Sequence, residues 1–521
     1  MSAPATIPEL VAAAADRFAD GLAVVDGDVA LTYGELGTRS RQISFDLKAF
    51  GIGPRDRVAI WSFNSVEWVV AALGIWQAGA VLVPVNTRFK GGEAADILGR
   101  SGAKLLFTAT DFLGADYVEL LRASGAELPD LDTTVVLRGP AGEGCVAWDE
   151  FVGRGGNGDG GALPAVGAGD PSDILFTSGT TGAPKGVVQT HGRTMCVATD
   201  WVTMTGLQAG DRYLMVNPYF HMFGLKAGIL ASIAAGATML PQPVFDVDRV
   251  LARVGEEQVT VLPGAPTLYQ SILDHPDRAR YDLSTLRIAV TGAADIPVEL
   301  IRRVRAELPF SVVITGYGLT EAGTATATSP DDDPETVATT VGRPRTGFEL
   351  RIVDDKGHDV GDGQPGEVVL RGPSVMSHYL DDPLATADTL SDDGWLRTGD
   401  LGIVGDDGCL RIVGRSKDMF IVGGFNAYPA EIENMLLRHP AIQQAAVVGI
   451  PDPRLGEVGM AFVVLAPGVS ASGDDVIEWS RNEMANYKVP RRVEIVTELP
   501  LNATGKVMKD VLRQRAAEVP A

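Results

Sequence analysis

The chain has 521 residues, of which 45% are hydrophobic, and its formal net charge at pH 7 is -23. This apolar content supports sizeable cores and excludes a disordered chain, while the acidic balance argues against a general nucleic-acid-binding or anionic-membrane surface. The three cysteines are far apart and show no metal-binding spacing, so we expect free thiols in a reducing cytoplasm. No apolar run approaches the roughly 20 residues that span a bilayer, so we expect no stable membrane insertion.

The first predicted element is a surface helix, because residues 1–20 carry acidic side chains in place of the basic segment of a signal peptide. Strand-like and helix-like stretches then alternate, as where "RVAIWSF" is followed by "SVEWVVAALGIWQAG" and then by "AVLVPVN". The alternation returns in "LRIAVTGAA" and "VELIRRVRAEL". This rhythm predicts an α/β fold with doubly wound, mostly parallel sheets and helices on both faces. Ligands of such sheets gather at the carboxyl ends of the strands.

Further along the chain, the pattern changes to short strands separated by turns, such as "FELRIVDDKG", "GEVVLRG" and "GCLRIVG". We therefore expect a small, β-barrel-like unit over about residues 345–416. An α+β module follows, which includes "AYPAEIENMLLRHP" and "DDVIEWSRNEM". The sequence thus predicts a large N-terminal domain, residues 1–416, and a small C-terminal domain, residues 417–521.

A candidate phosphate-binding loop lies in "ILFTSGTTGAPKGVV", residues 174–188. Glycines there permit positive φ, so that backbone N–H groups can converge on an anion, and a lysine supplies charge. The stretch departs from the Walker pattern, and a polar turn after a strand would explain a lone Gly/Thr loop equally well. The candidate ATP contacts in it are Thr177, Ser178, Gly179, Thr180, Thr181, Gly182 and Lys185.

The order "TSGTTGAPKG" is more specific, because other motifs follow it at characteristic distances. They are "YFHMFG", "TGAADIP", "GYGLTEAG", "RTGD", "GRSKD", "GGFNAYPAEIE" and "PLNATGKVMK". Together these motifs resemble those of the adenylate-forming superfamily, which includes acyl-CoA synthetases, nonribosomal adenylation domains and firefly-type luciferases. The resemblance spans nearly the whole chain, and the probability that so many ordered motifs agree by chance is very small.

The resemblance implies an ATP site. Tyr317 would offer a flat face to adenine, a stacking worth about 1–3 kcal/mol, and Asp400 would accept hydrogen bonds from both ribose hydroxyls. Arg415 would contact the ribose and a phosphate. The remaining candidate contacts are backbone groups around the adenine and one hydroxyl that would donate to a phosphate, namely Gly292, Ala293, Ala294, Gly316, Gly318 and Thr320.

The implied reaction has two steps. A carboxylate attacks the α-phosphorus of ATP to give an acyl-adenylate and pyrophosphate, and the thiol of coenzyme A then displaces AMP. Two anions meet in the first step, so positive charge is needed at the transition state. Mg²⁺ held by Glu321, with Thr177 as its second contact, and the amine of Lys506 fit that need. The candidate catalytic residues are therefore Lys506, Glu321, Thr320 and His221.

Two roles stay open for His221. The resemblance places it in the acid pocket, where it would line the pocket or gate entry between the two steps, and we favour this role. Its ordinary pKa near 6.5 would also permit it to act as general base for the thiol.

The resemblance also implies a mobile C-terminal domain. Lys417 occupies the hinge position, about which this domain would swing to withdraw Lys506. The swing would present Gly423, Gly424 and Phe425 to the channel for coenzyme A, and glycine allows a close approach of the backbone.

The predicted acid pocket is apolar and rich in small residues, which favours a bulky hydrophobic acid. Its members are Phe220, His221, Met222, Phe223, Gly224, Ala322, Gly323 and Thr324. The stretch "VNPYFHMFG" lacks the aspartate with which nonribosomal adenylation domains hold an α-amino group, and no carrier domain follows Lys506. Both features favour a free-standing CoA ligase.

The longer stretches are most similar to actinobacterial FadD-type ligases, and among these to ligases that act on the indane-propionate remnant of sterol rings. Three alternatives stay open: a ligase for medium- or long-chain fatty acids, a fatty acyl-AMP ligase that does not use coenzyme A, and a luciferase-type enzyme. A noncatalytic protein with a decayed site is disfavoured, because Glu321, Asp400 and Lys506 are all present. The oligomeric state is left open, with a homodimer as one option.

Overall fold

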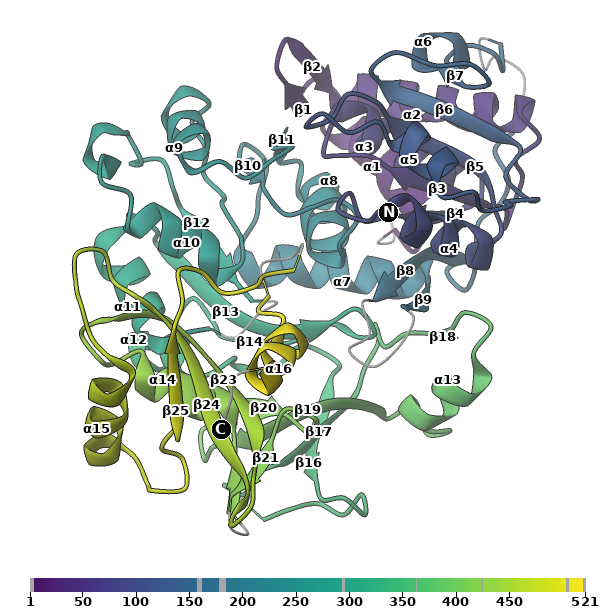
Figure 1. Ribbon diagram of the computed structural model, residues 1–521. Helices are drawn as coiled ribbons and strands as arrows, with labels where there is room; N and C mark the ends of the chain where they lie inside the picture. The colour runs from purple at the N-terminus through teal and green to yellow at the C-terminus, as the bar shows by residue number, and fades with distance from the viewer. Residues whose placement is uncertain are drawn as a thin grey trace.

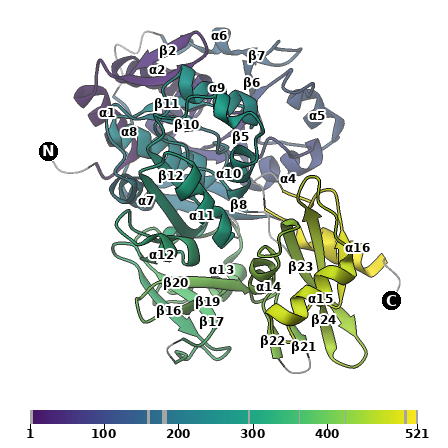
Figure 2. The ribbon, with the colours of Figure 1, turned by 90° about the vertical axis from the view of Figure 1, so that its left-hand side faces the viewer.

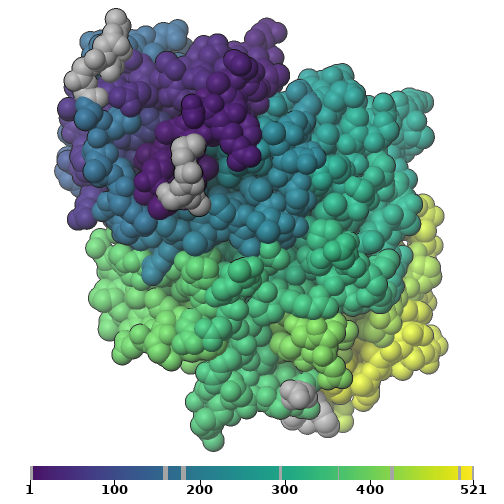
Figure 3. Space-filling model, turned by 180° about the vertical axis from the view of Figure 1, so that it is seen from behind, coloured from purple at the N-terminus to yellow at the C-terminus, as the bar shows by residue number. Residues whose placement is uncertain are grey.

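The computed structural model describes residues 4–156, 162–177, 184–292, 296–361, 363–422, 425–502 and 506–518. In these residues the elements from α1 to β20 form a large body, and those from β21 to α16 form a small lobe beside it (Figure 1). The mixed α/β fold with a large N-terminal and a small C-terminal part is confirmed. Seen from behind, the small lobe shows at one edge of the large body (Figure 3).

The first sheet of the large body has eight strands in the order β18-β9-β8-β4-β3-β5-β6-β7. Its neighbours pair in parallel from β8 to β7, whereas β9 pairs antiparallel with β8 and β18 antiparallel with β9. Its strands are β3 (Arg57–Trp61), β4 (Val81–Pro84), β5 (Ala103–Ala109), β6 (Thr133–Arg138), β7 (Val146–Ala147), β8 (Pro171–Thr177), β9 (Lys185–Thr190) and β18 (His378–Tyr379).

A second layer is built from two four-stranded sheets, ordered β10-β11-β1-β2 and β12-β13-β14-β15. Single bridges at Val261 connect them, since this residue pairs with Tyr213 of β10 and with Ile288 of β12. The strands are β1 (Leu22–Asp26), β2 (Val29–Thr32), β10 (Arg212–Met215), β11 (Thr238–Pro241), β12 (Ile288–Thr291), β13 (Val312–Leu319), β14 (Gly323–Ala327) and β15 (Arg343–Pro344).

Helices cover both layers. They are α1 (Ile7–Arg17), α2 (Tyr33–Ala49), α3 (Val66–Gln77), α4 (Gly91–Ser101), α5 (Tyr117–Ala123), α6 (Trp148–Phe151), α7 (His191–Thr205), the π-helix η1 (Phe223–Leu230), α8 (Ala231–Ala235), α9 (Val247–Glu256), α10 (Pro266–Leu273), the 3₁₀-helix η2 (Arg278–Arg280), α11 (Val298–Glu307), α12 (Pro334–Thr339) and α13 (Pro383–Thr389). No helix in the described ranges is long and apolar enough to cross a membrane.

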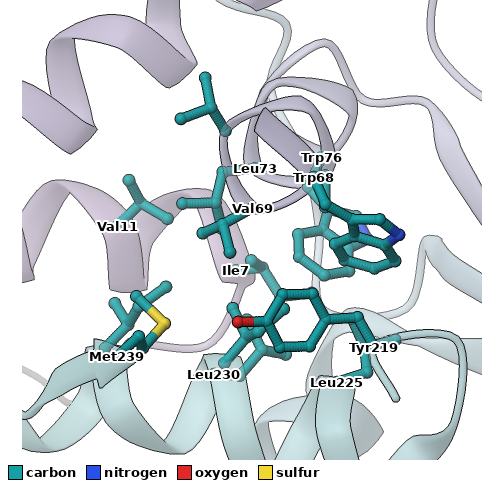
Figure 4. Close-up of a cluster of buried hydrophobic side chains, with 14 of the residues drawn as sticks. Ile7, Val11, Trp68, Val69, Leu73, Trp76, Tyr219, Leu225, Leu230 and Met239 are labelled. Atoms are coloured by element: carbon teal, nitrogen blue, oxygen red, sulfur yellow. The ribbon is translucent and has the colours of Figure 1, made fainter. Parts of the chain in front are cut away.

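The largest core of the large body forms around helix α3, in which every residue except Glu67 is buried and most are apolar. Ser65 caps its first turn by accepting from the backbone N–H of Trp68. Trp68 and Trp76 of α3 face Tyr219 of a later loop (Figure 4), and the rings of Trp68 and Tyr219 are 5.2 Å apart. This core therefore connects the N-terminal helices to the loop that carries the predicted acid pocket.

The predicted β-rich unit is a four-stranded antiparallel sheet in the order β16-β17-β19-β20. In the residues that the structure describes, no pairing between β16 and β20 closes it into a barrel. Its strands are β16 (Glu349–Val353), β17 (Gly366–Arg371), β19 (Leu396–Val404) and β20 (Leu410–Arg415). The register of β19 and β20 sets Asp400 opposite Arg415.

The small lobe has its own hydrophobic core, built from Phe420 onward. Figure 2 shows its sheet, ordered β22-β21-β24-β23 with β25 beside β24, as a unit separate from the sheets of the large body. Its elements are β21 (Phe420–Val422), β22 (Phe425–Ala427), α14 (Pro429–Leu436), β23 (Ile442–Asp452), β24 (Gly456–Leu465), α15 (Gly473–Glu483), β25 (Arg492–Ile495) and α16 (Lys509–Glu518). The domain boundary at residue 416 stays a prediction.

Candidate active site

A cavity of about 1150 Å³ lies between the large body and the small lobe, and both contribute to its walls. Most of the predicted site residues that the structure describes line it, although they are spread over more than 300 positions of the chain. These residues are Thr177, Lys185, Phe220, His221, Met222, Phe223, Gly292, Gly316, Tyr317, Gly318, Thr320, Glu321, Thr324, Asp400, Arg415 and Lys506.

Three predicted pocket residues lie behind the cavity wall. Ala322 is fully buried in the core beneath it, and Gly224 and Gly323 are buried as well. Gly224 is nonetheless needed, because a Cβ atom there would stand 2.2 Å from the carbonyl oxygen of Pro218. Nine predicted residues lie outside the described ranges: Ser178, Gly179, Thr180, Thr181, Gly182, Ala293, Ala294, Gly423 and Gly424. The side chain of Phe425 lies outside them too.

A hydrogen-bonded trio stands at the predicted nucleoside end of the cavity. The Tyr317 hydroxyl donates to Oδ2 of Asp400 at 2.6 Å, and Nε of Arg415 lies 3.0 Å from Oδ1 of the same carboxylate. Asp400 is 6% exposed. Burial, followed by the charge of Asp400, raises the pKa of the Tyr317 hydroxyl well above its ordinary value, so this hydroxyl is a hydrogen-bond donor. The carboxylate is thereby oriented before any ligand arrives.

A second cluster surrounds the Glu321 carboxylate. Its Oε1 accepts a 2.8 Å hydrogen bond from the hydroxyl of Tyr379, a residue for which the sequence motifs give no signal. Nζ of Lys185 stands 4.9 Å from the centre of the Tyr379 ring. Thr177 and Lys185 face each other on β8 and β9, and the Thr177 hydroxyl donates to the Lys185 carbonyl at 3.4 Å. The groups predicted to serve the metal and phosphates thus meet at one end of the first sheet.

His221 stands at the entrance to helix η1. Its Nδ1 accepts from the backbone N–H of Phe223 at 3.2 Å, so the neutral ring carries its proton on Nε2. Burial, with a smaller contribution from the positive charge of Lys506, lowers the pKa of His221 to about 4. The imidazole is therefore neutral at physiological pH. The effect of the Lys506 charge on the pKa of His221 also indicates that Lys506 reaches the same part of the cavity.

Lys506 belongs to the small lobe. Its backbone N–H donates to Oδ1 of Asn502 at 2.9 Å, and the N–H of Asn502 donates back to the Lys506 carbonyl at 2.8 Å. Nη1 of Arg88, on the large body, donates to the Asn502 carbonyl at 3.3 Å. A second bridge between body and lobe joins Nε2 of Gln443 to Oδ2 of Asp274 at 2.9 Å. The Arg88 contact ties the Asn502–Lys506 pair to the large body, and the Gln443 contact ties strand β23 to it.

Lys417 lies in the turn between β20 and β21, at the junction of the large body and the small lobe. Burial and the neighbouring charge of Arg415 lower the pKa of its amine. An ion pair between Asp418 and Arg513 of α16 fastens this turn to the small lobe. The hinge assigned to Lys417 stays a prediction.

The apolar part of the cavity draws on helices that the sequence motifs did not indicate. Trp201 and Met204 of α7, each 4% exposed, line it together with Ala227 of η1. The Trp201 ring packs edge-on against Phe223, with centroids 5.3 Å apart. A π-helix such as η1 is wider than an α-helix and is frequent at functional sites. No local signal in the sequence distinguishes Trp201 from a core residue.

The donor set fits ATP and a hard cation. Mg²⁺ is usually bound by one or two protein oxygens together with substrate phosphates, and Glu321 and Thr177 supply such oxygens on the cavity wall. At the nucleoside end, Oγ1 of Thr291 is buried and has no hydrogen-bond partner within the described residues, although Thr291 lines the cavity. A buried polar atom without a partner is costly, and a ligand that supplies one would relieve that cost.

Comparison with known proteins gives the following similarities. The AMP-binding enzyme family matches residues 11–380, and the AMP-binding enzyme C-terminal domain family matches residues 431–506. A 7a-methyl-1,5-dioxo-octahydroindenyl-propanoyl:CoA ligase of Rhodococcus jostii is 48% identical over 98% of this chain and 99% of its own length. The ligase of the same name from Mycobacterium tuberculosis is 49% identical over 98% of each chain.

Among solved structures, the anthranilate CoA ligase AuaEII in complex with anthranoyl-AMP superposes with a TM-score of 0.91. It is 30% identical in sequence, and the match covers 98% of this chain and 97% of that one. The similarity extends over both the large body and the small lobe, so the whole architecture is shared.

Proposed function

The chain belongs to the AMP-binding enzyme family, and we propose that it is an ATP-dependent, AMP-forming acyl-CoA ligase for a bulky, fused-ring propanoic acid. An oxygen of the acid attacks the α-phosphorus of ATP, and pyrophosphate leaves with the electrons of the broken P–O bond. The sulfur of coenzyme A then attacks the carbonyl carbon of the acyl-adenylate, and AMP leaves. The products are acyl-CoA, AMP and pyrophosphate.

The observation that carries the proposal is the convergence of two distant sets of residues on one cavity. Tyr317, Glu321 and Asp400 come from strands β13 and β19 and from the turn after β13, all in the large body, whereas Lys506 comes from the small lobe. Adenylation needs this combination, because the nucleotide must be held while positive charge is aimed at the reacting phosphorus.

Each group then has a defined task. The oriented Asp400 carboxylate would bind the ribose hydroxyls, and the Tyr317 ring would stack on the adenine. The Lys506 ammonium would offset the charge that develops as two anions approach. Mg²⁺, held by Glu321 and Thr177, would supply Lewis-acid neutralisation of the phosphates when bound.

His221 fits the role of pocket wall and gate better than that of base. A pKa of about 4 makes the ring a weak proton acceptor at neutral pH, since general bases act best when their pKa lies near the working pH. His221 lines the cavity, and the positive charge of Lys506 acts on its ring. A movement of this ring would open or close the path by which the thiol approaches.

The identity of the acid is argued from relatives and from the pocket. Two relatives with 48% and 49% identity carry the name of a ligase for a dioxo-octahydroindenyl propanoate, a bicyclic acid. In this chain Trp201, Met204 and Phe223 supply a broad apolar surface, and Ala227 leaves space beside it. Such walls suit a fused ring, because burial of apolar area contributes roughly 25 cal/mol per Å².

The acid specificity is tested by comparing substrates. AMP release with ATP and coenzyme A should be fastest, in kcat/KM, for an indane-type propanoate and much slower for octanoate and palmitate. A preference for octanoate or palmitate would instead establish the fatty-acid ligase.

The acceptor is tested by measuring pyrophosphate release with and without coenzyme A, and by following the acyl-CoA product. Coenzyme A should sustain turnover and be acylated. Accumulation of acyl-adenylate without acylation of coenzyme A would identify an acyl-AMP ligase.

The cellular location is proposed from the cysteines. Three cysteines without a pairing pattern favour a cytoplasmic enzyme. A homodimer stays one option for the assembly. Sedimentation of the purified protein would decide the oligomeric state.

A further inference from the structure

Tyr379 separates the two charged groups at the phosphate end of the cavity. Its side chain is 5% exposed; its hydroxyl donates to Oε1 of Glu321 at 2.8 Å, and its ring face lies 4.9 Å from Nζ of Lys185. One buried side chain thus contacts both the predicted metal ligand and the predicted phosphate-binding lysine.

The backbone around Tyr379 is fixed from three sides. Strand β18 pairs with β9, with Tyr379 opposite Val187, and the N–H of Leu380 donates to the Gly186 carbonyl at 2.7 Å. The N–H of Met376 donates to the Glu321 carbonyl at 2.6 Å, so the same segment also holds the turn that carries Glu321. The Tyr379 ring is therefore placed by the sheet and does not depend on a ligand for its position.

The hydroxyl has a chemical consequence for Glu321. Holding one carboxylate oxygen fixes the rotation of the group and leaves the other oxygen for a hard cation. Partners that orient a metal ligand in this way commonly contribute 10–100-fold to metal affinity or activity. The Tyr379 hydroxyl is the donor in this hydrogen bond, because an ionised carboxylate can only accept.

The ring has a consequence for Lys185. An ammonium group over an aromatic face is held by the electrostatic field of the ring. Without the ring, Lys185 would be drawn directly to the Glu321 carboxylate, because opposite charges in a partly enclosed site attract strongly. Such an ion pair would occupy the carboxylate needed for the cation and the ammonium needed for the phosphates.

We propose that Tyr379 is a positioning residue that orients Glu321 for Mg²⁺ through its hydroxyl and keeps Lys185 available to the ATP phosphates through its ring. This inference rests on the proposed function, because it assigns Glu321 to the metal. It gives the hydroxyl and the ring of Tyr379 separate roles, which two substitutions can distinguish.

Tyr379→Phe removes the hydroxyl and keeps the ring, whereas Tyr379→Leu removes both. Binding of Mn²⁺ to the full-length enzyme in the presence of ATP, without acid, is measured by electron paramagnetic resonance. We expect Tyr379→Phe to weaken Mn²⁺ binding about tenfold. Tyr379→Leu should weaken it further and should also raise the Kd of ATP measured without metal, which Tyr379→Phe should leave unchanged.

Tyr33→Phe is the matched control, because Tyr33 is 2% exposed and its hydroxyl donates to two backbone carbonyls away from the cavity. It should leave Mn²⁺ binding unchanged. Glu321→Gln supplies the second control: if Tyr379 acts through Glu321, adding Tyr379→Phe to this variant should cost little more.

Two outcomes would overturn the proposal while leaving the proposed function intact. One is Mn²⁺ binding by Tyr379→Phe that equals or exceeds that of the wild-type enzyme. The other is a tenfold loss that persists when the change is added to Glu321→Gln, which would indicate a general structural effect. Wild-type enzyme that binds no Mn²⁺ with ATP would overturn both proposals.

Discussion

The two sides of the cavity are built in different ways. On the large body, Asp400 is buried, and strand register and a tyrosine hydroxyl hold its carboxylate in place. On the small lobe, Lys506 is bonded to Asn502, whose carbonyl accepts an exposed hydrogen bond from Arg88 of the body. The body therefore presents a preformed nucleotide wall, whereas the lysine is delivered across an interface. The nucleoside-binding groups on the first side should serve both half-reactions, and the lysine should serve one.

The largest effect is expected for Lys506→Ala. Loss of positive charge at a transition state costs roughly 10²–10³-fold in kcat, so acyl-adenylate formation should fall by at least that factor. Thioester formation from supplied acyl-adenylate should largely survive. Pyrophosphate release and acyl-CoA formation, assayed separately, measure the two half-reactions.

Lys356→Ala, in an exposed turn of the β-rich sheet, is the matched lysine control for that test. Equal losses in both half-reactions of Lys506→Ala would contradict the division between the two sides of the cavity.

The second largest effect is a loss of folding stability at low pH, caused by a histidine in the large body. His191 is fully buried there, and burial lowers its pKa to about 4. An unfolded histidine titrates near 6.5, so as the pH falls from 6.5 towards 4 the unfolded chain takes up a proton that the folded chain refuses. The folded state should lose about 3 kcal/mol over this window from His191 alone.

Urea unfolding at pH 7 and pH 4.5 measures that loss. His191→Asn should reduce the difference between the two pH values, since Asn does not titrate. A difference that is the same in His191→Asn as in the wild-type protein would show that other groups cause the acid sensitivity.

The third largest effect is expected for Asp400→Asn, which should weaken ligand binding in both half-reactions. Hydrogen bonds to a charged group contribute about 1.5–3 kcal/mol, so the KM for ATP should rise about tenfold or more. The second half-reaction should show a similar rise in the KM for acyl-adenylate, because both ligands carry the same ribose.

Asp407→Asn, in the turn between β19 and β20, is the control on the same sheet. If Asp400→Asn impaired one half-reaction alone, Asp400 would not belong to a wall shared by both steps.

The smallest effect is expected at the interface itself. Gln443→Ala removes the hydrogen bond to Asp274, and an exposed bond of this kind is worth about 0.5–1 kcal/mol. Adenylation should slow about threefold, and thioester formation should stay unchanged or rise. Gln258→Ala, an exposed glutamine whose side chain bonds within the large body, should change neither rate. A larger loss in thioester formation than in adenylation would indicate that this contact belongs to the second step.

Sequence reasoning predicted the fold class and most of the cavity wall, for reasons that individual residues show. Tyr317, Glu321 and Asp400 stand in motifs whose order along the chain is distinctive, and each lines the cavity. Ala322 and Gly323 stand in the same motif, but they are buried behind the wall. Membership of a motif therefore does not determine which side chains face a ligand.

The cavity residues that the sequence did not indicate lie outside the motifs. Tyr379 lies 58 positions after Glu321 and belongs to none of the motifs, yet it donates to that carboxylate. Trp201 and Met204 lie on α7 with a spacing typical of any helix buried on one side. Their roles depend on sheet order and helix packing, which local sequence does not encode.

The sequence by itself determined the chemistry: the types of residue, their order along the chain, and the βα alternation that sends strand ends to one edge. Only the tertiary structure decided which groups touch. Pairing of β18 with β9 brings Tyr379 to Glu321 and Lys185, and pairing of β19 with β20 brings Asp400 to Arg415. The physical reason is that a catalytic distance of about 3 Å is set by hydrogen-bond register and packing between segments far apart in the chain.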